Sequence, residues 1–475
     1  MKTYPLYLNG QFVRTPKTIR VVNPSTTEVF AEICTVERSA IAQALKDAHA
    51  AFQGWRALTG KARGSFLNQI ADEVENRCDE IARAITMENG KPLAQSVGEI
   101  AMTVDHLRWF AEEARRAYGR IVPNQTDGKR HLVVKTPIGV VAAISPWNFP
   151  LVLAVRKIAP ALAAGCPVIL KPASATPVCA ALFAECVAGV KLPPGVFQLV
   201  SGSARDIAQE FLDNPLCRKI TFTGSTEVGK ELIRGAADQV KPLSLELGGH
   251  APVLVFEDAD LDAAVEGVLI TKFRNTGQSC IASNRIYVHR SIYEKFLAKF
   301  VEKTLALKTS DGFEVGVAVG PLINEEGLNK ALEHIHDAVK RGARLLCGGK
   351  RIARSGFFLE PTVLADVPED AACMSEETFA PVAPVVPFDS DDEAIERANH
   401  SQFGLSAYAF TRDLKRSFRL MELLEIGTLG INDGVPTTSN CPFGGVKQSG
   451  WGRELSVEGM DAFLETKHVS LGLGI

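Results

Sequence analysis

The chain has 475 residues, 46% of them hydrophobic and 23% charged, which is the composition of a folded globular protein and excludes extensive disorder. At roughly 150 residues per domain, this length predicts about three domains. The 52 Lys and Arg against 55 Asp and Glu leave a formal charge of −3, so we expect no basic field and no nucleic-acid partner.

The first 120 residues show helical periodicity in two places. One apolar stripe consists of Ile41, Ala44, Leu45, Ala48, Phe52 and Trp55, and the other of Val97, Ile100, Ala101, Val104, Leu107 and Phe110. Each stripe predicts a helix that packs one face inward.

After Gly119 the pattern changes to extended segments at 132–135 and 140–144 and then to short apolar runs that alternate with helices. These runs are 167–170, 196–200, 220–223, 243–245, 253–256 and 285–289. Such alternation predicts βα units and a mostly parallel sheet, an α/β fold. Gly165 is expected to end a helix, and Lys171 and Ser174 then follow a strand at the sheet edge where ligands bind.

Two features bear on compartment and metal binding. The ten cysteines are scattered without a CxxC pair, so we expect no disulfide framework, no metal site and a reducing, cytoplasmic location. No signal peptide is recognisable, and prolines and charges interrupt the most apolar stretch, 138–170, so no membrane span is expected. His334 and His336, two apart on a predicted helix, do not share a face and are expected to face solvent.

Four segments place polar or reactive groups beside glycine, proline or a strand end: 145–150, 222–229, 245–250 and 273–280. The second, FTGSTEVG, follows a predicted strand and opens a predicted helix. Its backbone N–H groups are placed to receive a pyrophosphate, although glycine-rich turns of this kind are often only tight turns.

Cys280 and Glu246 are the candidate reactive groups. Gly-Gln-Ser before Cys280 is poor core sequence and predicts a turn that presents the thiol to a cleft as a nucleophile. Glu246 ends an apolar strand before two glycines, which would leave a general base room to swing towards a water. Read alone, this glutamate is also consistent with an exposed carboxylate or a helix cap.

The four segments occur in the order and at the spacings of the aldehyde dehydrogenase superfamily, followed by EETFAPV and PFGGVKQSGWGRE. The whole chain therefore resembles that superfamily. The resemblance implies a Rossmann-type cofactor domain at 1–122 and 143–250 and an α/β catalytic domain at 251–440. It also implies a small β oligomerisation domain, made of a hairpin at 123–142 and a strand at 460–475.

The resemblance implies three catalytic residues. Cys280 would add to the aldehyde carbonyl to give a thiohemiacetal, and Asn148 with the Cys280 backbone N–H would hold the oxyanion. After hydride transfer to the nicotinamide, Glu246 would activate the water that hydrolyses the thioester. Family members that transfer the acyl group to coenzyme A generally lack this glutamate, so a free acid is the expected product.

The resemblance assigns cofactor contacts to Trp147 and Ser225 near the pyrophosphate, Glu377 and Phe379 at the nicotinamide ribose, Lys171 at the adenosine ribose, and also to Ser174, Gly224 and Leu247. NAD-preferring members commonly have a glutamate at the position of Ser174, which would repel a 2′-phosphate. Serine removes that repulsion and Lys171 supplies charge. We therefore predict activity with NADP, alongside NAD.

The substrate class follows from two arginines. Arg156 and Arg274 match the positions that bind the distal carboxylate in succinate-semialdehyde dehydrogenases, the branch that this chain resembles most, and Thr438 or Ser439 would donate to the same carboxylate. Ala282 stands where some of these enzymes carry a second cysteine, so no local redox switch is expected.

Three alternatives remain at this point. Glutarate and 2-oxoglutarate semialdehydes differ from succinate semialdehyde too little to be separated from it. A generalist enzyme for uncharged aldehydes would use the two arginines structurally. A non-catalytic cofactor-binding role is opposed by the intact Cys280, Glu246 and Asn148. The apolar C-terminal run, 468–475, is expected to pair or pack in a homodimer or homotetramer.

Overall fold

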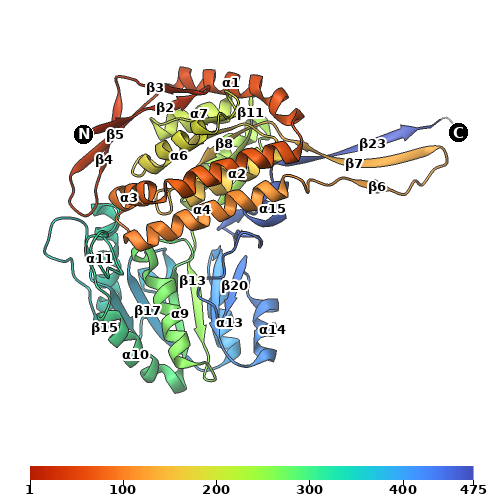
Figure 1. The fold of residues 1–475 in the computed structure, drawn as a ribbon. Coiled ribbons are helices and arrows are strands. Elements are labelled where there is room, and N and C mark those ends of the chain that lie inside the picture. The colour runs from red at the N-terminus through yellow and green to blue at the C-terminus, as the bar shows by residue number, and fades with distance from the viewer. Residues whose placement is uncertain (474–475) are drawn as a thin grey trace.

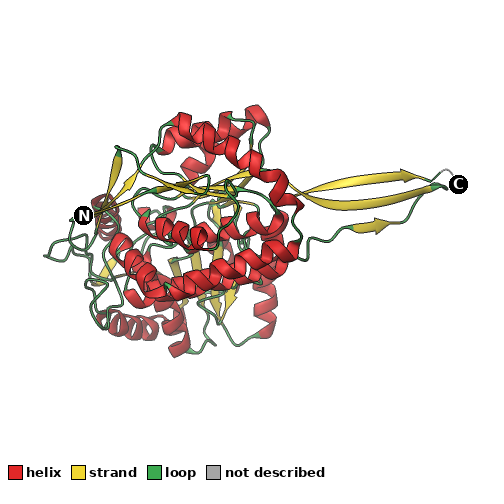
Figure 2. Ribbon diagram, turned by 45° about the horizontal axis from the view of Figure 1, so that its top comes forward, coloured by secondary structure: helices red, strands yellow, loops and turns green. Residues whose placement is uncertain are grey.

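A computed structural model describes residues 1–473 of the chain. Figure 1 shows an upper and a lower α/β body, and a narrow β arm that leaves the upper body. Two long paired strands and a short third one form this arm (Figure 2). The α/β fold predicted from the sequence is therefore confirmed.

Short strands occupy residues 1–34, where the helical pattern does not extend. β1 (Lys2–Tyr4), β4 (Thr18–Val22) and β5 (Val29–Cys34) form a small sheet, and β2 (Leu6–Leu8) with β3 (Gln11–Val13) lies at the edge of the largest sheet. β1, β2 and β3 have three residues each, too few to set a period in the sequence; the sequence analysis missed these strands and also β4 and β5.

Four helices follow: α1 (Arg38–Ala57), α2 (Gly60–Asn76), α3 (Cys78–Asn89) and α4 (Leu93–Glu113). The stripe predicted for α1 is buried at all its positions. The prediction for α4 is partly wrong, because Val97 and Ala101 are exposed while Ser96, Glu99 and Thr103 are buried. Each of these buried polar side chains has a hydrogen-bond partner, which offsets its loss of hydration, so counting apolar residues misplaces this face.

The largest sheet forms the centre of the upper body, with strand order β22-β12-β11-β8-β9-β10-β2-β3. Its parallel strands are β8 (Val140–Ile144), β9 (Val168–Lys171), β10 (Phe197–Leu199), β11 (Cys217–Thr223) and β12 (Leu243–Glu246). Their helices are α5 (Val152–Ala164), α6 (Val178–Gly189), α7 (Ala204–Asp213) and α8 (Thr226–Ala236). The predicted alternation is confirmed, and Gly165 ends α5 with a φ of 98°.

The lower body contains a seven-stranded sheet with order β15-β16-β17-β14-β13-β19-β20. Its strands are β13 (Ala251–Val255), β14 (Ser283–His289), β15 (Arg344–Cys347), β16 (Thr362–Ala365), β17 (Val382–Phe388), β19 (Ser406–Phe410) and β20 (Thr428–Ile431). Its helices are α9 (Leu261–Phe273), α10 (Tyr293–Leu305), α11 (Glu325–Lys340), α12 (Ala372–Ser375), α13 (Asp391–Asn399) and α14 (Leu414–Leu423).

After the lower body the chain returns to the upper one. β18 (Phe403–Gly404) pairs with β21 (Val446–Lys447), and β22 (Gly450–Trp451) adds antiparallel to β12. α15 (Ser456–Asp461) then leads into the arm. Residues 441–459, which no predicted domain includes, thus complete the main sheet.

The arm consists of β6 (Arg120–Val122), β7 (Lys129–Pro137) and β23 (Leu464–Gly472). β23 pairs with β7 along its whole length, so the C-terminal run pairs within its own chain. The hairpin starts three residues before the predicted 123–142, and the end of that range belongs to the main sheet as β8. Gly474 and Ile475, the end of the predicted strand, lie outside the described residues.

One histidine prediction is wrong. His334 is buried on the inner face of α11, where its Nδ1 lies 3.1 Å from the Thr378 hydroxyl, whereas His336 on the opposite face is exposed. The spacing separates the two faces correctly but does not show that one of them packs against the protein. No helix in the described part of the chain is both long and apolar enough to cross a membrane.

Candidate active site

The predicted site segments meet at one edge of the main sheet. β8, β9, β11 and β12 are parallel neighbours, so the loops after their carboxyl ends open on the same side. The loop after β8 carries Trp147 and Asn148, and β12 ends at Glu246. The segment before β14 brings Cys280 from the lower body to the same place.

A cavity of about 200 Å³, here called the cofactor-side cavity, collects most of the residues predicted to bind the cofactor. Its lining is Pro146, Trp147, Asn148, Thr223, Gly224, Ser225, Leu247, Gly248, Cys280, Glu377 and Phe379. The Trp147 and Phe379 rings meet edge to face with centroids 5.5 Å apart. Lys171 and Ser174 do not line this cavity; Lys171 is buried at the end of β9, and Ser174 is half-buried in the following turn.

The FTGSTEVG segment forms the predicted turn from strand to helix. Ser225 caps α8, its Oγ accepting a hydrogen bond from the Val228 N–H at 3.4 Å. A helix N-terminus carries partial positive charge and favours an anion beside it.

A groove of about 540 Å³ continues along α8 on the side of α7. It is lined by Ala204, Arg205, Ala208, Gln209, Leu212, Val228, Glu231, Leu232 and Gly235. The sequence analysis missed this surface because these are ordinary helix residues without a motif.

The segment before Cys280 turns sharply, as its sequence predicts. Asn275 and Thr276 have positive φ angles of 50° and 60°, and Gly277 has a φ of 72°. A Cβ at Gly277 would lie 2.2 Å from the Ala380 carbonyl oxygen, so only glycine fits there.

Cys280 is half-buried and belongs to the linings of two cavities. Burial, then the carboxyl groups of Glu377 and Glu246, raise the pKa of its thiol to about 12, although Arg156 opposes them. The side chain of Asn148 lies in the same cavity and donates from Nδ2 to the Gln278 carbonyl at 3.2 Å.

The two glycines after Glu246 were predicted to leave room for its side chain to swing, and the structure shows a further reason for glycine at these positions. A Cβ at Gly249 would lie 2.0 Å from the Cys280 carbonyl oxygen, and one at Gly248 would lie 3.3 Å from Glu377 Oε2. Glycine therefore allows this backbone to touch the loop that carries the thiol.

Glu246 is buried, with 4% of its surface exposed, so an exposed carboxylate is excluded. Burial raises its pKa well above the ordinary value, and Glu454 adds to this effect, whereas Lys157 and Arg156 oppose it. Within residues 1–473 its Oε2 has no hydrogen-bond partner. A buried carboxyl group of this kind suits a general base.

A buried ion pair that the sequence analysis missed lies behind Glu246. Lys157 donates to Glu454 and also to the Thr223 hydroxyl, the latter at 2.6 Å. Lys157 breaks the apolar pattern of α5, and Glu454 ends the last family-like segment. Their sequence separation hides the contact, although a lysine inside an apolar helix was a usable signal.

Glu377 lies at the far wall of the cofactor-side cavity. Its Oε1 accepts from the Gly249 N–H at 3.2 Å, and Lys330 donates to its carbonyl at 2.8 Å. Burial raises the pKa of its carboxyl group to about 7. This group can accept a hydrogen bond from a hydroxyl that enters the cavity.

A second cavity, the substrate-side cavity, opens on the other side of Cys280. Its lining is Met102, Phe149, Val152, Leu153, Arg156, Arg274, Ser279, Cys280, Ile281, Val435, Thr437 and Phe443. The thiol therefore lies where two cavities meet.

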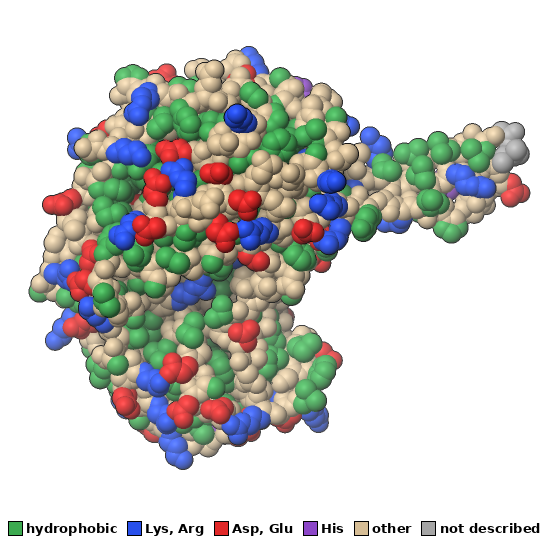
Figure 3. Space-filling model, viewed as in Figure 1, with side chains coloured by type: hydrophobic (Ala, Val, Ile, Leu, Met, Phe, Trp, Pro, Cys, Tyr) green, Lys and Arg blue, Asp and Glu red, His purple; other side chains and the backbone are tan. Residues whose placement is uncertain are grey.

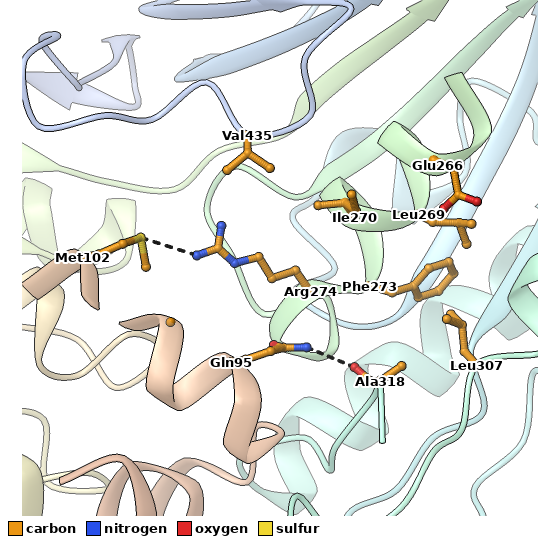
Figure 4. Close-up of a pocket in the computed structure, with 11 residues that line it drawn as sticks. Gln95, Met102, Glu266, Leu269, Ile270, Phe273, Arg274, Leu307, Ala318 and Val435 are labelled. Carbon is orange, nitrogen blue, oxygen red and sulfur yellow. Dashed lines mark hydrogen bonds between the residues drawn. The ribbon is translucent and has the colours of Figure 1, made fainter. Parts of the chain in front are cut away.

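Arg156 and Arg274 enter the substrate-side cavity without an acidic partner in the described part of the chain. Arg156 lies over the Phe443 ring at 5.0 Å, and Arg274 lies over the Phe149 ring at 5.3 Å. Arg274 points towards Met102 (Figure 4), and its one hydrogen bond goes to that sulfur at 3.7 Å. Two guanidinium groups with unused donors are arranged to bind an anion.

Thr438 and Ser439 are not brought to this cavity. Thr438 is exposed and donates to Asn440 at 2.8 Å, while the carbonyl of the buried Ser439 accepts from the Ser456 N–H. Thr437 lines the cavity instead, and its buried hydroxyl has no partner among residues 1–473. The sequence cannot tell which of three successive hydroxyl groups faces inward.

A wider pocket of about 520 Å³ adjoins the substrate-side cavity, with Met102, Arg274 and Val435 common to both (Figure 4). Apolar side chains of α9, Leu269, Ile270 and Phe273, form one wall. The Arg274 guanidinium thus stands between the inner cavity and this outer pocket.

Known proteins share this architecture. The model of the aldehyde dehydrogenase family matches residues 12–469. The glutarate-semialdehyde dehydrogenase of Pseudomonas aeruginosa is 47% identical over 98% of this chain and 97% of its own. The NADP(+) succinate-semialdehyde dehydrogenase of Escherichia coli is 45% identical over 98% of this chain and 97% of its own. A crystal structure of an NADP-dependent enzyme from E. coli has a TM-score of 0.98 and 45% identity over 99% and 98% of the two chains.

Proposed function

Because the chain belongs to the aldehyde dehydrogenase family, we propose that it oxidises succinate semialdehyde, or a close ω-semialdehyde such as glutarate semialdehyde, to the dicarboxylic acid with NADP or NAD. One observation supports this substrate class above others. Arg156 and Arg274 share a cavity with the Cys280 thiol and lack an acidic partner among the described residues. A carboxylate at the far end of the aldehyde supplies the missing anion.

The first step is addition of Cys280 to the aldehyde. The thiol loses its proton to Glu246 or to water, and its sulfur forms a C–S bond as the carbonyl π electrons move to oxygen. Asn148 Nδ2 and the Cys280 backbone N–H hold the resulting oxyanion; Nδ2 has two N–H donors, and the Gln278 carbonyl uses one of them.

Trp147, Glu377 and Phe379 in the cofactor-side cavity would hold NADP or NAD, which would supply a hydride acceptor. Loss of hydride from the thiohemiacetal carbon restores the C=O bond and leaves a thioester on Cys280. Glu246 then takes a proton from a water, whose oxygen adds to the thioester carbon. The C–S bond breaks, the thiol is regenerated and the acid leaves.

The residues present fit a dinucleotide. The cofactor-side cavity beside the thiol includes Ser225 at the N-terminus of α8, and a separate groove lies between α7 and α8. In the cavity, Trp147, Gly224, Leu247 and Phe379 would contact the dinucleotide, and Glu377 would accept from a ribose hydroxyl. Lys171 and Ser174 would meet the adenosine ribose, with no carboxylate at position 174 to repel a 2′-phosphate.

The arm supports self-association as a homodimer or homotetramer. Figure 3 shows hydrophobic side chains along the arm. In the arm segments of the sequence, Ile121, Leu471 and Leu473 are exposed. Its outer strand β23 has one unpaired edge in this chain. The sedimentation coefficient checks this proposal, since a monomer at micromolar concentration would refute it.

The test of function is a substrate panel assayed with both cofactors. It compares succinate, glutarate and 2-oxoglutarate semialdehydes with butanal and pentanal, which have similar length but no anionic end. We expect kcat/KM for the best semialdehyde to exceed that for the uncharged aldehydes at least a hundredfold. Equal values would instead support the generalist reading, in which the arginines are structural.

A further inference from the structure

We propose that residues 88–91, at the end of α3 and in the turn before α4, form a clamp that positions the oxyanion-binding loop 145–150, with Lys91 acting on Asn148. The inference rests on the proposed function, because it takes Asn148 as the donor to the oxyanion. Lys91 touches neither cavity, so it is a positioning residue and not a catalytic one.

The carbonyl of Asn148 receives two strong donors. Lys91 Nζ donates to it at 2.7 Å, and Asn275 Nδ2 donates at 2.8 Å. Both lone pairs of the oxygen are thereby used. The preceding carbonyl, that of Trp147, accepts from Asn89 Nδ2 at 3.0 Å. Successive peptide groups of the loop are thus held at the point from which the Asn148 side chain projects.

A fully buried ion pair fixes Lys91 itself. Lys91 Nζ lies 2.7 Å from Glu99 Oε2, and neither side chain is exposed. The other oxygen of Glu99 accepts from the backbone N–H groups of Leu151 and Val152, at 3.0 and 3.2 Å, where α5 begins. The helix that carries Arg156 and the loop that carries Asn148 therefore share one buried charge network.

The clamp has no room to shift. Glu88 caps α6 by accepting from the N–H groups of Val178 and Cys179 at 2.7 and 3.0 Å. Gly90 has a φ of 88°, and a Cβ there would lie 2.5 Å from the Pro321 ring. A segment fixed at both ends and in its middle can hold the oxyanion donor in one place, which is what stabilisation of a developing charge requires.

The experiment is a double-mutant cycle between Lys91→Met and Asn148→Ala, read as kcat and KM on the best aldehyde of the panel. Loss of one oxyanion donor lowers kcat about 10²- to 10³-fold, which sets the scale for Asn148→Ala. We expect Lys91→Met to lower kcat about tenfold to a hundredfold. The KM for the aldehyde and the KM for the cofactor should each change less than threefold. In the Asn148→Ala background the same change should lower kcat less than threefold, because no donor remains to be positioned.

The matched control is Lys241→Met, which removes another buried lysine that donates only to backbone carbonyls, those of Phe211, Leu212 and Asn214. It should lower thermal stability without lowering kcat. Additive losses in the double mutant, or equal losses of kcat in Lys91→Met and Lys241→Met, overturn the clamp.

Lys91→Met leaves the buried Glu99 without its lysine partner and for that reason could fail to fold. A second variant keeps the test open in that case. Asn275→Gly removes the other donor to the Asn148 carbonyl, suits the positive φ and leaves no buried charge. It should show the same loss of kcat and the same lack of additivity. If Asn148→Ala retains full kcat, the proposed oxyanion role of Asn148 is wrong, and the clamp proposal fails with it. If Asn148→Ala loses kcat but the Lys91 and Asn275 variants do not, only the clamp proposal is wrong.

Discussion

Replacing Arg156 by Met removes a charge while keeping most of the side-chain volume against Phe443. Truncating one partner of a buried, hydrogen-bonded charge pair costs about 2–5 kcal/mol. Since each 1.36 kcal/mol is a factor of ten, kcat/KM for the semialdehyde should fall about 30-fold to several thousandfold. Arg156 is only 6% exposed, so we expect the upper part of this range. Arg274→Met, half-buried beside the outer pocket, should lie near the lower end.

The assay is the initial rate of reduced-cofactor formation, followed by absorbance, on the semialdehyde and on an uncharged aldehyde of equal length. For the uncharged aldehyde the same variants should change kcat/KM less than threefold. Arg63→Met is the control, because this buried arginine donates to the carbonyls of Leu58 and Ala163 and lines neither active-site cavity. Equal losses on both aldehydes would show that the two arginines are structural and would refute the reasoning.

Three further predictions concern the cofactor, the base and the thiol. Ser174→Glu should lower kcat/KM for NADP at least tenfold and leave that for NAD within threefold, as measured with both cofactors at saturating aldehyde; unchanged NADP kinetics would contradict the assignment of Ser174. Glu246→Gln should let the thioester accumulate, seen as a mass increase on Cys280 after rapid quenching; a variant that turns over without this adduct would exclude Glu246 as the hydrolytic base. Because the thiol pKa is about 12, the fraction of Cys280 present as reactive thiolate increases with pH. The rate at which iodoacetamide alkylates the free enzyme should therefore rise about tenfold per pH unit from 7 to 10. A rate that reaches a plateau below pH 9 would contradict the effect of burial on this pKa.

The sequence predicts this fold and much of this site because the information is local. Strand-length apolar runs give the parallel sheet, and GQSC gives a turn whose positive φ angles the structure shows. Parallel strands bring their carboxyl ends together at one edge, which is where Lys171 and Ser174 were expected. Trp147 and Ser225, which follow β8 and β11, share a cavity with the thiol, and Glu377 reaches the same cavity from the segment before β17.

What the sequence does not predict depends on contacts between distant segments. Lys157 meets Glu454 across 297 residues, and Lys91 meets Asn148 across 57, so the local sequence does not show the partner of either lysine. The buried face of α4 was misplaced for a related reason, since the partners of the buried Glu99 are Lys91 and the N–H groups of Leu151 and Val152, all outside α4. Thr437, and not Thr438 or Ser439, lines the substrate-side cavity because of the backbone conformation of this loop, and no pattern in the sequence shows that conformation.

Two strands that complete the upper body and the arm are synthesised late. β22 completes the main sheet beside β12, and β23 completes the arm beside β7, yet both come from the final residues of the chain. At 5–20 residues per second, a ribosome needs about 10 to 45 s to travel from β12 to β23. The β12 edge and Lys157 lack their partners until residues 450–454 have been made, and the β7 edge stays open until β23 follows. The ion pair behind Glu246 therefore becomes complete only after residue 454 has been synthesised, and premature pairing of those edges is the hazard that folding must avoid.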